Sequence, residues 1–259
     1  MKNKKIIALI LAVLMLCTAG LMGCQKQESD KVIIGVDDSF PPMGFRDDNN
    51  NIVGFDIDVA TAVFERLGME FEILPIDWTA KEVELNSNKV DLLWNGYTIN
   101  DERKEKVAFS DPYLNNYQVL VVKDDSDYQT REDLAGKKLA LQSGSSAEEA
   151  LDAAADFKAS LAEVNGFADN LKAFMELESG MSDAVLVDEV VANYYISAQK
   201  KPFRVLEDKL AQEEYGIGFR KDDPLRDKVN NELIAMAKDG SLAEISEKWF
   251  GSDVTTIGK

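Results

Sequence analysis

The chain has 259 residues, which allows one large domain or two modest ones and a sizeable core. Hydrophobic residues make up 45% and charged residues 29%, the composition of an ordinary globular protein. There is no histidine, which excludes Ser-His-Asp and Cys-His nucleophile activation and histidine-based zinc sites. The formal net charge of -18 makes nucleic acids and other polyanions unfavourable partners.

The first residues have the pattern of an export signal. Lys2, Lys4 and Lys5 precede an apolar run, and small residues follow that run near Cys24. Residues 6–23 carry no charge, so an uncleaved membrane-spanning helix is the alternative interpretation. Either way, the rest of the chain is exported.

The sequence Leu21-Met22-Gly23-Cys24 resembles a bacterial lipobox, in which the cysteine is acylated and becomes the mature N-terminus. We therefore predict a signal peptide over residues 1–23, lipidation of Cys24 and a polar tether over residues 24–30. The lipid would hold the protein on the outer face of the cytoplasmic membrane, at the cell surface or in the periplasm.

From residue 32 onward, predicted strands alternate with predicted helices. The clearest helix begins after Gly54: apolar residues from Phe55 to Leu67 recur at spacings of three and four, and Gly68 ends the pattern. Short apolar runs predict strands at 32–36, 71–74, 90–94, 119–122, 139–141 and 184–187. Further helices are predicted at 81–87, 100–106, 147–155, 169–177, 189–197 and 225–237. This alternation indicates an α/β fold with mostly parallel sheets.

Three short segments have both a structural and a functional interpretation. The run Asp47 to Asn51 departs from a calcium loop and favours a hairpin turn. The run Gln142 to Ser146 lies between a strand and a helix, where it suits helix capping or anion binding. Ser241 to Glu244 fits a capping box that opens the last helix. No P-loop or complete dinucleotide fingerprint is present, so we expect no cofactor, and we expect no metal site.

The charged run from Asp101 to Lys106 has the composition of a solvated helix face, with Glu102 paired to Lys106. It follows the loop that leaves a predicted parallel strand at Asn95 to Thr98, where open α/β sheets place their ligands. Arg103 at this helix start can present its planar guanidinium to a carboxylate.

Asp188 ends an apolar strand and opens a helix, so it is either an N-cap or an acceptor for a cation in the same crevice. Phe40 and Trp78 follow predicted strands; each belongs either to the core or to the wall of a pocket.

Several segments in order resemble the extracellular solute-binding proteins of polar amino acid ABC importers. The resemblance runs from about Lys31 to Gly251. The segments that carry it are Asp37 to Pro42, Val53 to Ala60, Gly96 to Arg103, Phe109 to Tyr113, Asp183 to Asp188 and Lys248 to Gly251.

The resemblance implies a two-lobed fold of the type II periplasmic-binding-protein kind. Each lobe would be a mostly parallel sheet flanked by helices. The first lobe would comprise residues 31–113 and 216–259, and the second residues 118–210. Two hinge strands would join them at residues 113–117 and 211–215, with the ligand between the lobes.

The resemblance also implies roles for individual residues. In that family, the position of Arg103 pairs with the ligand's α-carboxylate, helped by the positions of Gly96, Thr98 and Ser146. The position of Asp188 takes the α-ammonium group.

The positions of Phe40 and Trp78 are those of the aromatic residues that sandwich the ligand. The positions of Asp37, Asn95 and Gln142 are those that touch the ligand's side chain.

The resemblance predicts a substrate-binding lipoprotein that captures a polar or charged amino acid, with cystine and basic amino acids as candidates. It would be a monomer that delivers the ligand to an ABC transporter permease, and its membrane contact would be the N-terminal lipid. The alternative is an enzyme on the same scaffold, because cyclohexadienyl and arogenate dehydratases resemble these proteins and use a carboxylate as general acid. We expect binding rather than catalysis.

Overall fold

The structure is a computed structural model, and it describes residues 31–259. The predicted signal peptide, the lipidation of Cys24 and the tether lie outside the described residues. Within the described part of the chain, no helix is both long and apolar enough to cross a membrane.

Strands from both predicted lobes belong to one hydrogen-bonded sheet. Its strands are β1 (Val32–Val36), β5 (Phe71–Pro75), β6 (Leu92–Thr98), β7 (Ala108–Phe109), β8 (Leu114–Lys123), β9 (Lys138–Gln142), β10 (Glu163–Phe167), β11 (Ala184–Asp188) and β12 (Phe203–Phe219). Their order is β10-β9-β11-β8-β12-β6-β1-β5, with β7 paired to β12. A small second sheet holds β2 (Ser39–Phe40), β3 (Gly44–Arg46) and β4 (Ile52–Val53).

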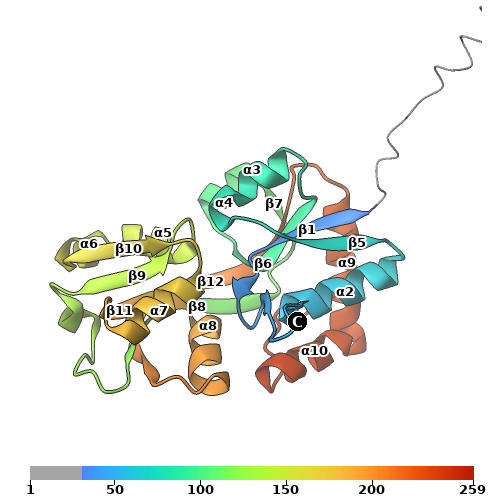
Figure 1. Cartoon of the computed structure of the whole chain (residues 1–259). Helices are drawn as coiled ribbons and strands as arrows, with labels where there is room; N and C mark the ends of the chain where they lie inside the picture. Colours follow the sequence, from blue (N-terminus) through green and yellow to red (C-terminus); the bar gives the residue numbers. More distant parts are fainter. Residues whose placement is uncertain (1–30) are drawn as a thin grey trace, which may run out of the picture. The chain divides into compact units, whose positions relative to one another are not determined.

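Two parallel sets of strands lie on either side of an antiparallel pair. β1 runs parallel to β5 and β6, and β9 runs parallel to β10 and β11. Between these sets, β8 and β12 run antiparallel to each other (Figure 1). This arrangement confirms the predicted α/β fold class with mostly parallel strands flanked by helices.

The helices follow the strands as the sequence predicts. They are α2 (Phe55–Leu67), η1 (Trp78–Ala80), α3 (Lys81–Asn86), α4 (Asp101–Lys106), η2 (Arg131–Leu134), α5 (Ser146–Ala153), α6 (Ala155–Ser160), α7 (Asn170–Ser179), α8 (Glu189–Asn193), η3 (Tyr194–Ala198), α9 (Leu225–Asp239) and α10 (Ser241–Phe250). In Figure 1, α2 lies beside α9 and α10, and residues of these three helices are in contact.

Helix α2 shows how the sequence determines a helix here. Phe55, Val59, Val63 and Phe64 are buried on one face, and burying such a side chain stabilises the fold by about 1.5–3 kcal/mol. Gly68 adopts the left-handed conformation and its N–H bonds to carbonyls of the last turn, so the helix ends where the sequence predicts.

Other local predictions have mixed outcomes. The hairpin turn at Asp47 to Asn51 is confirmed: it joins β3 to β4, and the Asp47 carboxylate accepts from the backbone N–H of Asn51. The capping box of the last helix is wrong. Gly240 is the N-cap of α10, and Ser241 is the first helical residue, with its hydroxyl bonded to Asp239.

The two predicted crossings lie side by side in the antiparallel pair. Glu213 is opposite Asn116, and Tyr215 is opposite Leu114. The lobe boundaries and the bending of the chain at these strands stay predictions; we keep the names first lobe and second lobe for the residue ranges given above.

Candidate functional site

A small cavity lies between the two lobes, at the carboxyl ends of several parallel strands. It is lined by Asp37, Phe40, Trp78, Asn95, Gly96, Arg103, Gln142, Ser145, Ser146 and Asp188. Nine of the ten residues predicted to bind a ligand are in this set, and the tenth, Thr98, contacts Ser146. The residues converge because β1, β5, β6, β9 and β11 all end at this crevice, as expected for an open α/β sheet.

The cavity has a volume of about 10 Å³, which is roughly the room that one water molecule needs. The crevice is therefore closed in this structure. A small organic molecule could enter only if its two walls moved apart, as in hinge-type closure.

Arg103 is the inward-facing residue of the charged run. Its neighbours in α4 are exposed and Glu102 pairs with Lys106, as predicted, whereas Arg103 is only 2% exposed. Asn100 caps the helix by accepting from the Arg103 backbone N–H, which fixes where the side chain starts.

The guanidinium of Arg103 is only partly satisfied. One terminal nitrogen donates to the Thr98 carbonyl at 3.1 Å, and the other pairs with Glu149 of α5 at 2.9 Å. The ring of Tyr97 lies 4.9 Å from the guanidinium carbon, a cation–π distance. The Nε atom is buried and has no hydrogen-bond partner among the described residues. An unsatisfied N–H on a cation that lines a cavity favours an anionic partner.

Asp188 is positioned as an acceptor rather than as a helix cap. It is the N-cap residue of α8, yet its side chain makes no capping bond. Instead, its Oδ1 accepts from Asn116 at 2.7 Å and from the Tyr215 hydroxyl at 2.6 Å. Burial, and then the like charge of Glu213, raises the pKa of Asp188. A cationic group beside Asp188 would favour its ionised form, and would so oppose the effects of burial and of the Glu213 charge on its pKa.

Asp37 and Gln142 meet across the crevice. The Gln142 amide donates to Asp37 Oδ2 at 2.6 Å, and Asn170 donates to the Gln142 oxygen at 3.0 Å. Burial raises the pKa of Asp37 to about 6, although the hydrogen bonds from Gln142 and from the Ser39 backbone oppose the shift.

Gly96 and Asn95 form the floor of the crevice on β6. Gly96 has a φ of 57°, and an added Cβ would lie 2.7 Å from a ring carbon of Phe40, so only glycine fits here. Its N–H donates to the buried carboxylate of Asp56 at 2.7 Å. Both polar atoms of the Asn95 side chain are buried without a hydrogen-bond partner among the described residues, which marks a place for a polar ligand.

Trp78 and Phe40 form apolar walls and are both buried. Lys81, which the sequence did not single out, lies 5.3 Å from the Trp78 ring and is 3% exposed. Its ammonium group donates to the Gly144 carbonyl of the second lobe at 2.8 Å. Burial, and then the charge of Arg103, lowers the pKa of Lys81 to about 8.

Ser145 has the capping role predicted for its segment, and the anion-binding role of Ser146 stays a prediction. Ser145 caps α5 by accepting from the Glu148 backbone N–H. The Ser146 hydroxyl faces the crevice, within 3.1 Å of the Thr98 hydroxyl and 3.4 Å of Glu213.

Glu213 is the most connected residue that sequence reasoning missed. Its Oε2 atom accepts from Asn116 at 3.1 Å and from Gln118 at 3.0 Å, and the Thr98 hydroxyl lies 3.1 Å from it. A signal was present, because side chains two apart in a strand share a face and Tyr215 points inward. The predicted hinge at residues 211–215 includes Glu213, but the prediction did not single out its buried carboxylate.

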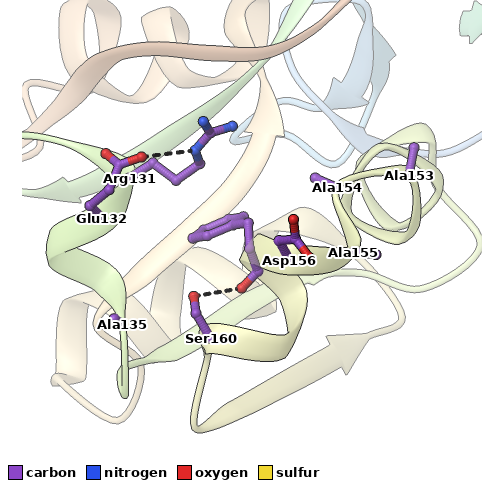
Figure 2. Close-up of a pocket in the computed structure, with 9 residues that line it drawn as sticks. Arg131, Glu132, Ala135, Ala153, Ala154, Ala155, Asp156 and Ser160 are labelled. Atoms are coloured by element: carbon purple, nitrogen blue, oxygen red, sulfur yellow. Dashed lines mark hydrogen bonds and ion pairs between the residues drawn. The ribbon is translucent and has the colours of Figure 1, made fainter.

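A larger hollow of about 580 Å³ lies on the second lobe (Figure 2). It is lined by Arg131, Glu132, Phe157, Ser160, several alanines and Asp156. Figure 2 shows Arg131 paired with Glu132. The Ser160 hydroxyl donates to the Phe157 carbonyl. None of the predicted binding residues lines it. The smaller crevice, with its buried and unsatisfied polar atoms, is the better candidate site.

Comparison with known proteins agrees with this geometry. A model of the bacterial extracellular solute-binding proteins, family 3, matches residues 32–252. The chain belongs to this family. The resemblance inferred from the motifs is thereby confirmed, and the family description places its members outside the cytoplasm.

Two curated relatives of this solute-binding protein are named for amino acids. The L-cystine-binding protein TcyJ of Escherichia coli is 33% identical over 239 residues, covering 91% of this chain and 88% of that protein. The arginine-binding extracellular protein ArtP of Bacillus subtilis is 32% identical over 251 residues, covering 93% and 97%.

A solved structure has the same fold. It is a substrate-binding protein of an ABC uptake transporter from Streptococcus pneumoniae with bound histidine, with a TM-score of 0.85 and 42% identity. The match covers 89% of this chain and 96% of that one. All three relatives are named as binding proteins rather than enzymes.

Proposed function

We propose that this solute-binding protein captures an amino acid between its two lobes and delivers it to the permease of an ABC importer. The observation that carries the proposal is the pair of opposite charges in one crevice: Arg103, whose Nε has no hydrogen-bond partner among the described residues, and Asp188 with its acceptor oxygens. An amino acid carries a carboxylate and an ammonium group, and burying both is tolerable only if each meets a fixed partner.

The two charged residues come from different lobes as defined above. A ligand that touches both would favour the closed state through its differential affinity for it. Several polar contacts already join the lobes in this structure, among them Asp37 to Gln142, Lys81 to Gly144, and Arg103 to Glu149. Closure would be the signal that the permease reads.

The ligand class we propose is a polar or charged amino acid. Asp37, Asn95 and Gln142 offer polar atoms to its side chain, and Phe40 and Trp78 offer apolar surface. Arginine, histidine and cystine are the candidates, because they are the ligands named for the relatives.

The N-terminal part of the proposal concerns anchoring. We infer that residues 1–23 are removed and that Cys24 carries the lipid, on the lipobox-like sequence alone. Mass spectrometry of the membrane fraction would show a diacylated or triacylated Cys24 at the N-terminus. A chain that begins at Met1 would contradict this inference.

A thermal-shift panel tests the ligand proposal. A ligand that binds only the folded state raises the melting temperature, by an amount that grows with its concentration relative to Kd. The panel should contain the common amino acids and cystine. Arg103→Ala is the control, because it lacks the guanidinium proposed to bind the ligand's carboxylate. A shift in the wild type that the variant lacks supports the proposal, and a panel without any shift contradicts it. The dehydratase alternative is tested separately, by incubation with arogenate or prephenate followed by product analysis. Turnover of either compound would support it.

A further inference from the structure

Glu213 connects both lobes to the crossing strands. It belongs to β12 and is buried, and its Oε2 atom lies within 3.4 Å of four polar groups. Thr98 belongs to the first lobe and Ser146 to the second, whereas Asn116 and Gln118 belong to β8. A carboxylate that gathers donors from three elements fixes their relative positions.

Asn116 links this carboxylate to the candidate ammonium site. Its amide nitrogen donates to Asp188 at 2.7 Å and to Glu213 at 3.1 Å. The two acidic side chains therefore share one donor group, and each is less than a tenth exposed. The rotamer of Asp188 is set by two donors to its Oδ1 atom, the Asn116 amide and the Tyr215 hydroxyl.

We propose that Glu213 is a positioning residue of the binding site: it holds the Thr98 and Ser146 hydroxyls and, through Asn116, presents the Asp188 carboxylate to the ligand's ammonium group. This inference rests on the proposed function and adds to it a residue of the crossing strand. It also assigns Glu213 an electrostatic effect, since a negative charge beside Asp188 strengthens the attraction for a cation and opposes the loss of the Asp188 proton.

Ionisable groups of the described residues that lie beside this cluster include Asp188 of β11, Tyr215 of β12, Tyr113, whose ring lies 6.4 Å from that of Tyr215, and Arg103, which bonds to the Thr98 carbonyl. Burial raises the pKa values of Tyr113 and Tyr215 well above their ordinary range, so both stay neutral near pH 7. Asp188 is the group whose protonation would weaken ammonium binding as the pH falls.

The test compares two neighbouring substitutions, Glu213→Gln and Glu214→Gln. Both remove one negative charge from adjacent positions of β12, but Glu214 is exposed, so Glu214→Gln is the matched control. Each protein is titrated calorimetrically with L-arginine, L-histidine and L-cystine between pH 5 and 8, and its folding is checked by urea unfolding.

We expect Glu213→Gln to weaken binding by roughly tenfold or more at pH 8, because the donors lose a charged acceptor. The pH at which affinity falls by half on the acid side should move down, because Asp188 loses its like-charged neighbour. Glu214→Gln should match the wild type in both respects. Equal behaviour of the two variants overturns the inference. So does a loss of affinity with an unchanged pH midpoint, because it would reduce Glu213 to a packing role.

A second variant keeps the test valid if Glu213→Gln does not fold. Asn116→Ala removes a donor from Asp188, so it should weaken binding and move the midpoint up, opposite to Glu213→Gln. An unchanged midpoint in Asn116→Ala overturns the inference. If the wild type binds no amino acid of the thermal-shift panel, the proposed function fails before the variants are compared, and the two failures are thereby distinguished.

Discussion

The amide of Gln142 donates to the carboxylate of Asp37 over 2.6 Å, although the two residues are 105 positions apart in the chain. The bond joins the end of β9 to the residue after β1, and it closes one side of the crevice. Both residues face the place where we propose that the ligand's side chain lies. The bond therefore competes with that side chain for the same polar atoms.

Asp37→Asn tests what Asp37 recognises. If the ligand's side chain carries a positive charge, the substitution should weaken binding of arginine by roughly tenfold or more, because a charged acceptor becomes a neutral one. Affinity for neutral amino acids should change much less. Calorimetric titration with arginine and glutamine measures the difference.

Asp38→Asn is the matched control for this substitution. Asp38 pairs with Arg46 at the surface, and it does not line the crevice. The Asp38→Asn substitution should leave the affinities for arginine and for glutamine unchanged. A selective loss for arginine in Asp38→Asn, or an equal loss for both ligands in Asp37→Asn, would contradict the role given to Asp37.

Lys81→Met tests the contact between the lobes. The Lys81 ammonium donates to the Gly144 carbonyl, so its loss should lower the population of the closed state. The apparent affinity falls with the fraction of molecules that can bind, and we expect a loss of about threefold to tenfold. Small-angle scattering without ligand should show a larger radius of gyration than the wild type. Lys89→Met, at an exposed lysine three residues after the end of α3, should change neither quantity.

Gly96→Ala tests the floor of the crevice. Gly96 has positive φ and an added methyl group would meet Phe40, so we expect a loss of about 2–4 kcal/mol in unfolding free energy together with weaker binding. Gly68→Ala is the control, because Gly68 has a similar φ but open space around its Cα. It should cost only the left-handed backbone penalty of about 1–2 kcal/mol. Equal losses in urea unfolding would mean that the contact with Phe40 does not matter.

Asp56→Asn tests the buried carboxylate beneath β6. Burial raises the pKa of Asp56 to about 7 in the folded protein from an ordinary value of 3.8, although the Gly96 N–H and Tyr113 oppose the shift. Between these two values the folded state holds a proton that the unfolded state has lost, so stability falls as pH rises through this window. The slope for this one group is roughly 1.4 kcal/mol per pH unit.

The asparagine side chain has no carboxyl group and does not titrate in this pH range. The unfolding free energy of the Asp56→Asn variant relative to the wild type should therefore rise steadily from pH 4 to pH 7 in urea unfolding. A difference that stays constant over this range would show that Asp56 keeps its ordinary pKa.

The sequence predicted the elements and most of the crevice because these depend on local patterns. Apolar spacing and Gly68 define α2, and the ends of parallel strands place Arg103 and Asp188 in one crevice. Family motifs then added Asp37 and Gln142, whose side chains meet only in the folded chain.

The partners of these residues could not be predicted in the same way. Glu149 pairs with Arg103 and Lys81 bonds to Gly144 because the two lobes face each other, and no local pattern specifies that contact. The failed capping box at Ser241 has a local cause: the Ser241 hydroxyl bonds to Asp239, two residues earlier.

The most direct test of the account is calorimetric titration of Arg103→Ala with the amino acid that gives the largest thermal shift. Arg131→Ala is the control, since Arg131 is an arginine of the second lobe outside the crevice. We predict that Arg103→Ala stays folded and loses about 3–5 kcal/mol of binding free energy, because the ligand's carboxylate would be buried without a partner. Arg131→Ala should bind as the wild type does. Wild-type affinity in folded Arg103→Ala would contradict the claim that this guanidinium holds the ligand.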